Sequence, residues 1–194
     1  CYDSQATFMA VSFETRLESE DRNRMIPVKK IIRHHGYQKI KASSAVNYAN
    51  RNDLSLLKLS TKAPKKAKIC KLPSPADEIT TADTHFTALG FGVIGESSFD
   101  DASDGVLRIK KFKLNNYKKT DRVFLVDQQD GGVCSGDSGG PAVIEKNRVP
   151  YVVGLVSSGL STNSSSFCHD TAVYTNISFY RKWILDGLAK LKAD

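Results

Sequence analysis

The sequence has 194 residues, of which 40% are hydrophobic and 25% are charged, and its formal net charge is +7. This composition is typical of a globular protein, and the length suits one large domain or two small ones. No apolar run reaches the roughly eighteen residues of a membrane-spanning helix, so we expect no membrane partner. The lysine clusters at 62–71, 110–113 and 118–119 lack interleaved aromatic residues. They indicate a solvated surface and no nucleic-acid partner.

Apolar, β-branched and aromatic residues predict strands in two separate parts of the chain. A stretch rich in Pro and Lys lies between the two parts and indicates a connection. The first part has expected strands at 6–13, from 26 up to a break at Gly36, and at 52–60. The second part has expected strands at 85–95, 106–114, 139–144, 150–159 and 171–177. Within the second of these, the alternation slips at Lys110 and Lys111, which predicts a β-bulge.

The C-terminal segment is predicted to be an amphipathic helix with Ser178 available as its N-cap. The apolar residues that recur at helical spacing are Tyr180, Ile184, Leu188 and Leu191. The predicted organisation is a first β unit at 1–61, a linker at 62–79, a second β unit at 80–177 and the helix at 178–194.

The chain has four cysteines, Cys1, Cys70, Cys134 and Cys168, and none forms a C-x-x-C pair. A zinc ribbon or a thioredoxin-type site is therefore unsupported. An even number of cysteines in a strand-rich chain favours disulfides and an oxidising compartment.

The stretch GGVCSGDSGGPAVI at 131–144 places Ser138 among glycines. Glycines let the backbone turn tightly, so they can expose a hydroxyl and bring N–H groups together. An acyl-transfer enzyme needs a nucleophilic oxygen beside such donors, and Gly136 and Ser138 would supply them as an oxyanion hole. The alternative is a glycine-rich turn that contains a serine by coincidence.

The string CSGDSGGPAVI resembles the nucleophile motif of the chymotrypsin/trypsin family of serine endopeptidases. Four further strings are similar to family segments in the same order: NDLSLLKL, ALGFG, LVSSG and VYTNISFYRKWI. In ALGFG, Phe91 stands where the family usually has Trp. The resemblance implies an all-β fold of two six-stranded antiparallel β-barrels, the first incomplete in this chain, with a C-terminal α-helix. The active site would lie in the cleft between the barrels.

The resemblance also implies roles for individual residues. Asp53 would orient a histidine, and that histidine would take the proton of the nucleophile Ser138. Ser157 would donate a hydrogen bond to Asp53, and Asp137 would pair with a new N-terminus after zymogen cleavage. Cys134 and Cys168 match a family disulfide that braces the specificity pocket.

The histidine itself has no counterpart in this sequence. The order in this fold is His, Asp, Ser, and His34 and His35, the only histidines before Asp53, resemble the end of a later strand. His85 and His169 follow Asp53 and break the order. The family histidine immediately precedes a cysteine, which here matches Cys1. We therefore expect the sequence to begin one residue after the general base and to be inactive as it stands.

Two cysteines bear on the same expectation. Cys1 matches a cysteine whose usual partner lies upstream of the histidine, and Cys70 resembles the one that ties a protease to a propeptide or light chain. A missing N-terminal segment would then be linked through them. The alternative for Cys70 is a buried free thiol.

The expected specificity pocket consists of Gly132, Val133, Ser157, Ser158, Gly159 and Ala172. Gly132 matches the floor position, where trypsin-like members carry Asp. An uncharged floor cannot compensate a buried cation, so cleavage after apolar or medium-sized residues is predicted. The loop at 160–167 could instead bring Asp170 to the pocket and restore a preference for basic residues.

Two functions therefore compete. One is a secreted serine endopeptidase, made as a zymogen, that acts on proteins or peptides and meets protein inhibitors. The other is a catalytically inactive homologue that serves as a binding or regulatory module. Neither requires a metal or cofactor. Asn163 and Asn176 lie in N-x-S patterns, which matter only in a glycosylating pathway.

Overall fold

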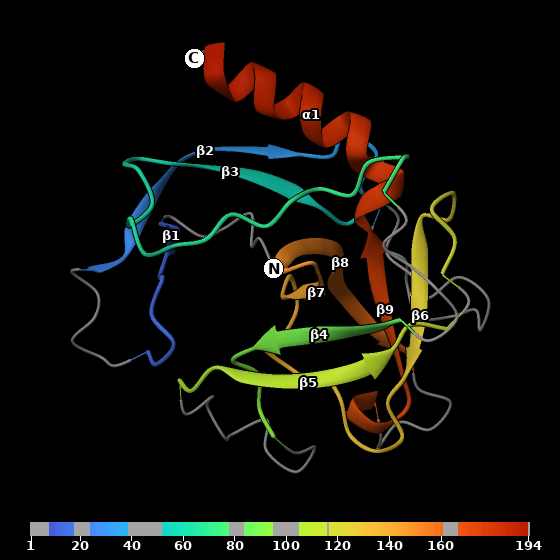
Figure 1. The fold of residues 1–194 in the computed structure, drawn as a ribbon. Helices are drawn as coiled ribbons and strands as arrows, with labels where there is room; N and C mark the ends of the chain where they lie inside the picture. The colour runs from blue at the N-terminus through green and yellow to red at the C-terminus, as the bar shows by residue number, and fades with distance from the viewer. Residues whose placement is uncertain are drawn as a thin grey trace.

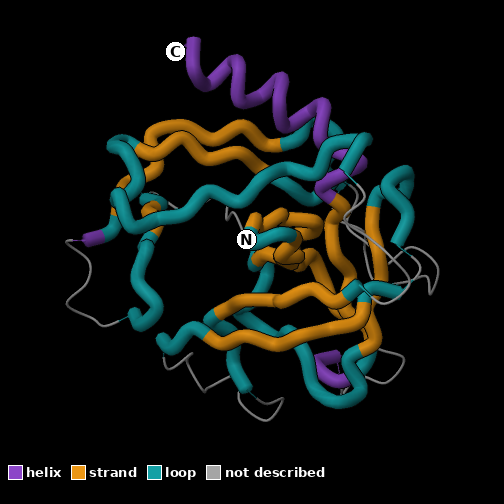
Figure 2. Tube along the Cα trace, in the orientation of Figure 1, coloured by secondary structure: helices purple, strands orange, loops and turns teal. Residues whose placement is uncertain are grey.

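A computed structural model describes residues 8–17, 24–38, 52–77, 84–94, 105–115, 117–160 and 167–193. These residues form two antiparallel sheets and a long C-terminal helix, α1 (Figures 1 and 2). The expected all-β fold class with a C-terminal helix is confirmed. Within the described residues, no helix is long and apolar enough to cross a membrane.

The smaller sheet contains the three strands expected in the first part of the chain. Its strands are β1 (Ala10–Val11), β2 (Ile26–Arg33) and β3 (Ser55–Leu59), in the order β1-β2-β3. Both pairings are antiparallel, and the register of β2 against β3 shifts between Val28 and Lys30. Residues 34–38 and 52–54, which flank this pair of strands, carry part of the site described below.

The larger sheet has six strands in the order β5-β4-β7-β8-β9-β6 and curls around its own core (Figure 1). Phe86, Phe112, Phe124 and Tyr174 form the aromatic centre of that core. The strands are β4 (His85–Gly90), β5 (Arg108–Lys113), β6 (Val123–Asp127), β7 (Pro141–Lys146), β8 (Val149–Leu160) and β9 (Thr171–Asn176). The sequence pattern had not predicted β6.

The β-bulge predicted at Lys110 and Lys111 is wrong. The register of β5 against β4 is continuous from Arg108 to Lys113. The pattern misleads because Ile109 faces outward and is 67% exposed. The side chain of Lys110 takes an inward position, where its ammonium lies over the Phe112 ring and donates to the Asp130 carbonyl.

The C-terminal helix α1 spans Ile177–Ala193. Asn176, rather than the predicted Ser178, caps it, because the Asn176 side-chain oxygen accepts from the Ser178 N–H at 3.0 Å. The same oxygen accepts from the Tyr117 hydroxyl at 2.9 Å, which ties the start of the helix to the loop before β6.

The buried face of α1 joins the two sheets. Ile177, Tyr180 and Ile184 pack with Leu54 into a second core cluster, which Leu155 of β8 also contacts. In Figure 1 the helix lies above β2 and β3, with the larger sheet below them. Leu188 was predicted to be buried but is 39% exposed.

Candidate active site

Asp53 lies in the segment that leads into β3, and contacts from the larger sheet hold it. Its carboxylate Oδ2 accepts a hydrogen bond from the Ser157 hydroxyl at 2.7 Å. Its backbone carbonyl accepts from the Thr175 hydroxyl on β9 at 3.0 Å. The next residue, Leu54, is buried in the cluster beneath α1. One carboxylate oxygen is therefore fixed by a hydroxyl, while the backbone is fixed separately.

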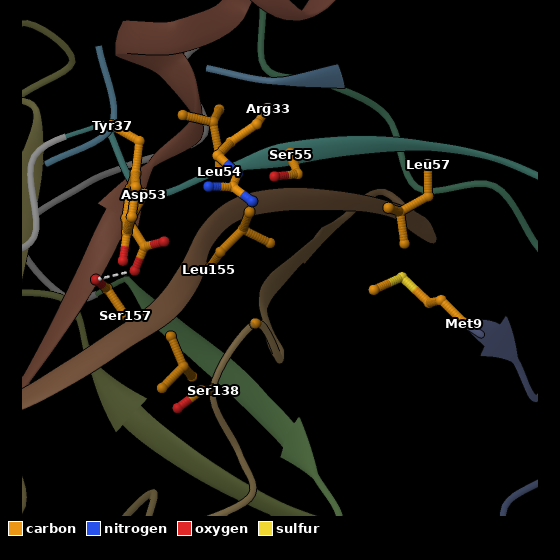
Figure 3. A pocket seen from close by; sticks show the side chains of 12 residues that line it. Met9, Arg33, Tyr37, Asp53, Leu54, Ser55, Leu57, Ser138, Leu155 and Ser157 are labelled. Atoms are coloured by element: carbon orange, nitrogen blue, oxygen red, sulfur yellow. Dashed lines mark hydrogen bonds between the residues drawn. The ribbon is translucent and has the colours of Figure 1, made fainter. Parts of the chain in front are cut away.

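A bulge in β8 determines the direction in which the Ser157 side chain points. In the pairing with β9, Val156 lies opposite Tyr174 and Ser158 lies opposite Val173, so Ser157 is the extra residue of a bulge. A bulge re-aims side chains relative to a regular strand. Here it directs the Ser157 hydroxyl to Asp53 across the boundary between the sheets (Figure 3).

Asn52 adopts a left-handed backbone conformation, with a φ of 55°, and its side chain is held at both ends. The amide Nδ2 donates to the Gly36 carbonyl at 2.6 Å, and the Tyr180 hydroxyl donates to Oδ1 at 3.0 Å. The residue before Asp53 is thus anchored to the turn after β2 and to α1. Asn tolerates this conformation better than most residues, so the Asn-Asp pair was the available signal, and the sequence reasoning missed it.

Ser138 lies in the loop between β6 and β7, and backbone hydrogen bonds fasten that loop to β8. The Gly139 N–H donates to the Val156 carbonyl at 2.7 Å, and the Val156 N–H donates to the Gly140 carbonyl at 2.9 Å. Gly136 and Gly139 have φ values of +94° and +81°, where a side chain would be strained. These two glycines therefore allow a backbone conformation of the loop that other residues would strain, as expected from the sequence.

The carboxylate of Asp137, the residue before Ser138, is held by main-chain N–H groups. It accepts from the Gly92 N–H at 2.8 Å and from the Cys134 N–H at 2.9 Å. A Cβ atom on Gly92 would lie only 2.5 Å from the carboxylate. Burial, followed by the Asp137 charge, raises the pKa of Tyr174 well above its ordinary range.

Asp53, Ser157 and Ser138 line one cavity of about 390 Å³. In Figure 3, Ser157 lies between Asp53 and Ser138. Sequence reasoning did not find Met9, Arg33 or Tyr37, which also line this cavity. The other described residues that line it are Leu54, Ser55, Leu57, Gly139, Leu155 and Val156.

None of the four histidines in the sequence is among the residues that line this cavity. His34 packs on α1 instead, with its ring 5.1 Å from the Trp183 ring and 4.8 Å from the His35 ring. His85 begins β4, and His169 ends the short 3-10 helix Phe167–His169; both are exposed.

A smaller cavity of about 150 Å³ adjoins Ser138. Of the expected specificity pocket, the structure brings Val133, Ser158 and Gly159 together there, with Cys134, Ser135 and Val156. Ser157 lines the larger cavity instead. Gly132 and Ala172 line neither cavity, and Ala172 is fully buried.

The disulfide between Cys134 and Cys168 is present in the structure, and Cys134 lines the smaller cavity. Asp170 does not line that cavity: its carboxylate accepts from the Thr171 hydroxyl at 3.3 Å. Most of the 160–167 loop, including Asn163, lies outside the described residues, as does Cys1.

Two other predicted positions have defined surroundings. Cys70 is a free, half-buried thiol, and burial raises its pKa. Asn176 is 0% exposed, and its amide nitrogen donates to the Lys118 and Asp121 carbonyls at 2.9 and 2.8 Å. The folded chain therefore offers no glycosylation site at Asn176.

Comparison with known proteins agrees with this fold. The family model described as Trypsin matches residues 1–184. The chain belongs to the trypsin family, whose members matched here are named as proteases.

Individual relatives match over most of this chain. Human serine protease 41 is 31% identical over 153 residues, which cover 69% of the chain and 46% of the relative. A trypsin of Phaedon cochleariae is 30% identical and covers 69% of the chain and 53% of the relative. A mouse kallikrein 1-related peptidase b3 is 28% identical over 178 residues, which cover 84% of the chain and 64% of the relative. The chain thus spans roughly half to two thirds of the length of these relatives.

Proposed function

We propose that this chain carries the nucleophile, the orienting carboxylate and the specificity pocket of a serine endopeptidase. One observation carries the proposal: Ser138 and the Ser157-bound carboxylate of Asp53 line the same cavity of about 390 Å³. An imidazole placed there could accept a proton from Ser138 and donate its other N–H to Asp53.

The proposed reaction is peptide hydrolysis through an acyl-enzyme. The Ser138 oxygen attacks the substrate carbonyl carbon while the imidazole takes the hydroxyl proton. The imidazolium then protonates the leaving amine as the C–N bond breaks, and water hydrolyses the ester by the reverse proton transfers. The N–H groups of Gly136 and Ser138 are proposed to bind the oxyanion.

The imidazole is proposed to come from polypeptide outside these 194 residues. Support comes from the positions of the four histidines, none of which lines the cavity. Without the base, an alcohol is a weak nucleophile, and loss of the base costs about a million-fold in turnover in such triads. The chain alone is therefore expected to be inactive.

The proposed substrate preference is for an uncharged side chain before the scissile bond. Support comes from the smaller cavity next to Ser138, because the lining residues that the structure describes carry no formal charge. Substrates are proteins or peptides. The Cys134–Cys168 disulfide favours an extracytoplasmic location, and Asp137 is the proposed acceptor of an activating N-terminal amine.

The second candidate, a catalytically inactive homologue that serves as a binding module, rests on the same histidine positions. It predicts that Ser138 stays inert when a base is supplied. Retention of Asp53, Ser157 and Ser138 around one cavity favours the endopeptidase.

Labelling with a serine-directed fluorophosphonate separates the two candidates. The chain is incubated with the probe with and without free imidazole, and the labelled residue is located by mass spectrometry. We expect imidazole to accelerate labelling of Ser138, and Ser138→Ala to abolish it. Ser60→Ala, which changes an exposed serine just after β3 that lines neither cavity, is the matched control. Labelling that is insensitive to imidazole would support the binding module.

A further inference from the structure

The side chain of Gln128 is packed against the main chain that borders the smaller cavity. It is 2% exposed, although it follows directly after the last residue of β6. Its Oε1 accepts from the Val133 N–H at 3.0 Å, and its Nε2 donates to the Val133 carbonyl at 3.2 Å. Its own N–H donates to the Asp170 carbonyl at 2.9 Å. The amide therefore fixes Val133, which lines the cavity.

Gln128 also fills the space that a side chain at position 132 would need. A Cβ atom on Gly132 would lie 2.5 Å from the Cβ and Cδ atoms of Gln128, and closer still to Oε1. Such separations are far inside van der Waals contact. Because both ends of the amide are bonded to Val133, Gln128 cannot move aside without leaving buried polar groups unpaired.

The cavity next to this amide has a defined size and charge. Its volume is about 150 Å³, and among the described residues that line it none is ionisable apart from Cys134, which is in a disulfide. Engineered apolar cavities of about this volume hold a benzene molecule. A cation entering an uncharged cavity would lose its hydration without gaining a partner.

We infer that Gln128 is a specificity-determining residue: it takes the place of a side chain at position 132 and keeps the pocket neutral. The inference rests on the proposed function, since it treats the smaller cavity as the seat of the residue before the scissile bond. Two consequences follow. An acidic residue introduced at Gly132 alone finds no room, whereas an acidic residue at Gln128 places a carboxylate against the main chain of Val133, which lines the pocket, without adding an atom to Gly132.

The test compares benzamidine with benzamide, its neutral isostere, as ligands of the whole chain at pH 8, by ligand-observed NMR titration. The wild-type chain is expected to bind benzamide more tightly. Gln128→Glu should raise the benzamidine-to-benzamide affinity ratio by about tenfold or more, as a charge-assisted hydrogen bond provides. Gln129→Glu adds the same charge to the exposed neighbouring residue and should leave the ratio unchanged.

A second pair of variants keeps the inference testable if Gln128→Glu fails to fold, as judged by circular dichroism. Gly132→Asp should leave the benzamidine-to-benzamide affinity ratio within about twofold of wild type, while the double variant Gly132→Asp/Gln128→Gly should raise it by about tenfold.

The inference is overturned if Gly132→Asp alone has the same ratio as the double variant, or if Gln129→Glu has the same ratio as Gln128→Glu. It is also overturned if the folded wild-type chain prefers benzamidine or binds neither ligand. Binding needs no hydrolysis, so failure of Ser138 labelling would leave these ratios intact and the two proposals separable.

Discussion

The hydroxyl of Tyr180 on α1 donates a 3.0 Å hydrogen bond to the side-chain oxygen of Asn52, the residue before Asp53. Through this contact the C-terminal helix, which is remote in sequence, helps to position the carboxylate of the site. Tyr180 is 3% exposed and Asn52 is half-buried, so the bond is partly buried. Helix docking and the geometry of Asp53 are therefore coupled.

Tyr180→Phe is expected to lower the free energy of unfolding by about 1–3 kcal/mol, because the Asn52 oxygen loses its donor in a partly buried setting. Urea unfolding measures this loss. A double-mutant cycle with Asn52→Ala isolates the pair, with an expected coupling of about 1 kcal/mol. Strictly additive variants would show that the hydrogen bond contributes nothing to stability.

The stability of the chain is expected to fall as the pH drops below 6.5, the ordinary pKa of a histidine side chain. Desolvation lowers the pKa of His34 in the folded chain, and the charges of His35 and Arg122 lower it further. Because the unfolded chain then binds more protons in this range, stability is complete above pH 6.5 and is lost as the pH falls through the lowered pKa.

Thermal unfolding between pH 5 and pH 8 would measure this dependence on pH, a range that brackets the ordinary titration of histidine. His34→Gln should flatten it. His85→Gln, which removes an exposed histidine from the larger sheet, controls for the loss of a histidine as such. An equal slope in wild type and His34→Gln would refute the assignment to His34.

Most of the strands could be predicted from sequence because buried alternation is a local signal. The alternation gave wrong predictions where contacts with residues distant in the sequence determine which side chains are buried. Ile109 faces solvent and Lys110 faces inward, since the Lys110 ammonium reaches the Asp130 carbonyl beyond the next strand. The capping of α1 by Asn176 likewise depends on Tyr117, which lies 59 residues away in the sequence.

The motif around Ser138 predicted the candidate site, whereas the contacts that hold the site residues could not be predicted. Gln128 resembles an ordinary polar residue after a strand, and only its two bonds to Val133 show that it is structural. The direction of Ser157 depends on a bulge that exists only when β8 pairs with β9. The family resemblance predicts the role of a residue, whereas the structure shows which contacts hold that residue in place.

Removal of the disulfide by Cys134→Ser/Cys168→Ser is expected to destabilise the chain by about 3–4 kcal/mol, since it closes a loop with a sequence separation of 34. Guanidinium unfolding with and without a reductant measures the effect. The reductant should shift the wild-type midpoint and leave that of the double variant unchanged. Cys70→Ser, which removes a free thiol, should retain the reductant-sensitive midpoint of the wild type.

Gly92 and Gly139 distinguish steric from conformational constraint in the Ser138 loop. Gly92→Ala would place its Cβ atom 2.5 Å from the Asp137 carboxylate, so the carboxylate must leave the two backbone N–H groups that it accepts from. We expect the free energy of unfolding to fall by about 2–3 kcal/mol.

At Gly139 nothing lies within 4 Å of an added Cβ, but the φ of +81° penalises a side chain. Gly139→Ala should therefore lower the free energy of unfolding by about 1–2 kcal/mol. Urea unfolding of both variants, together with imidazole-dependent labelling of Ser138, compares them. A smaller loss at Gly92 than at Gly139 would show that the Asp137 carboxylate can move without cost.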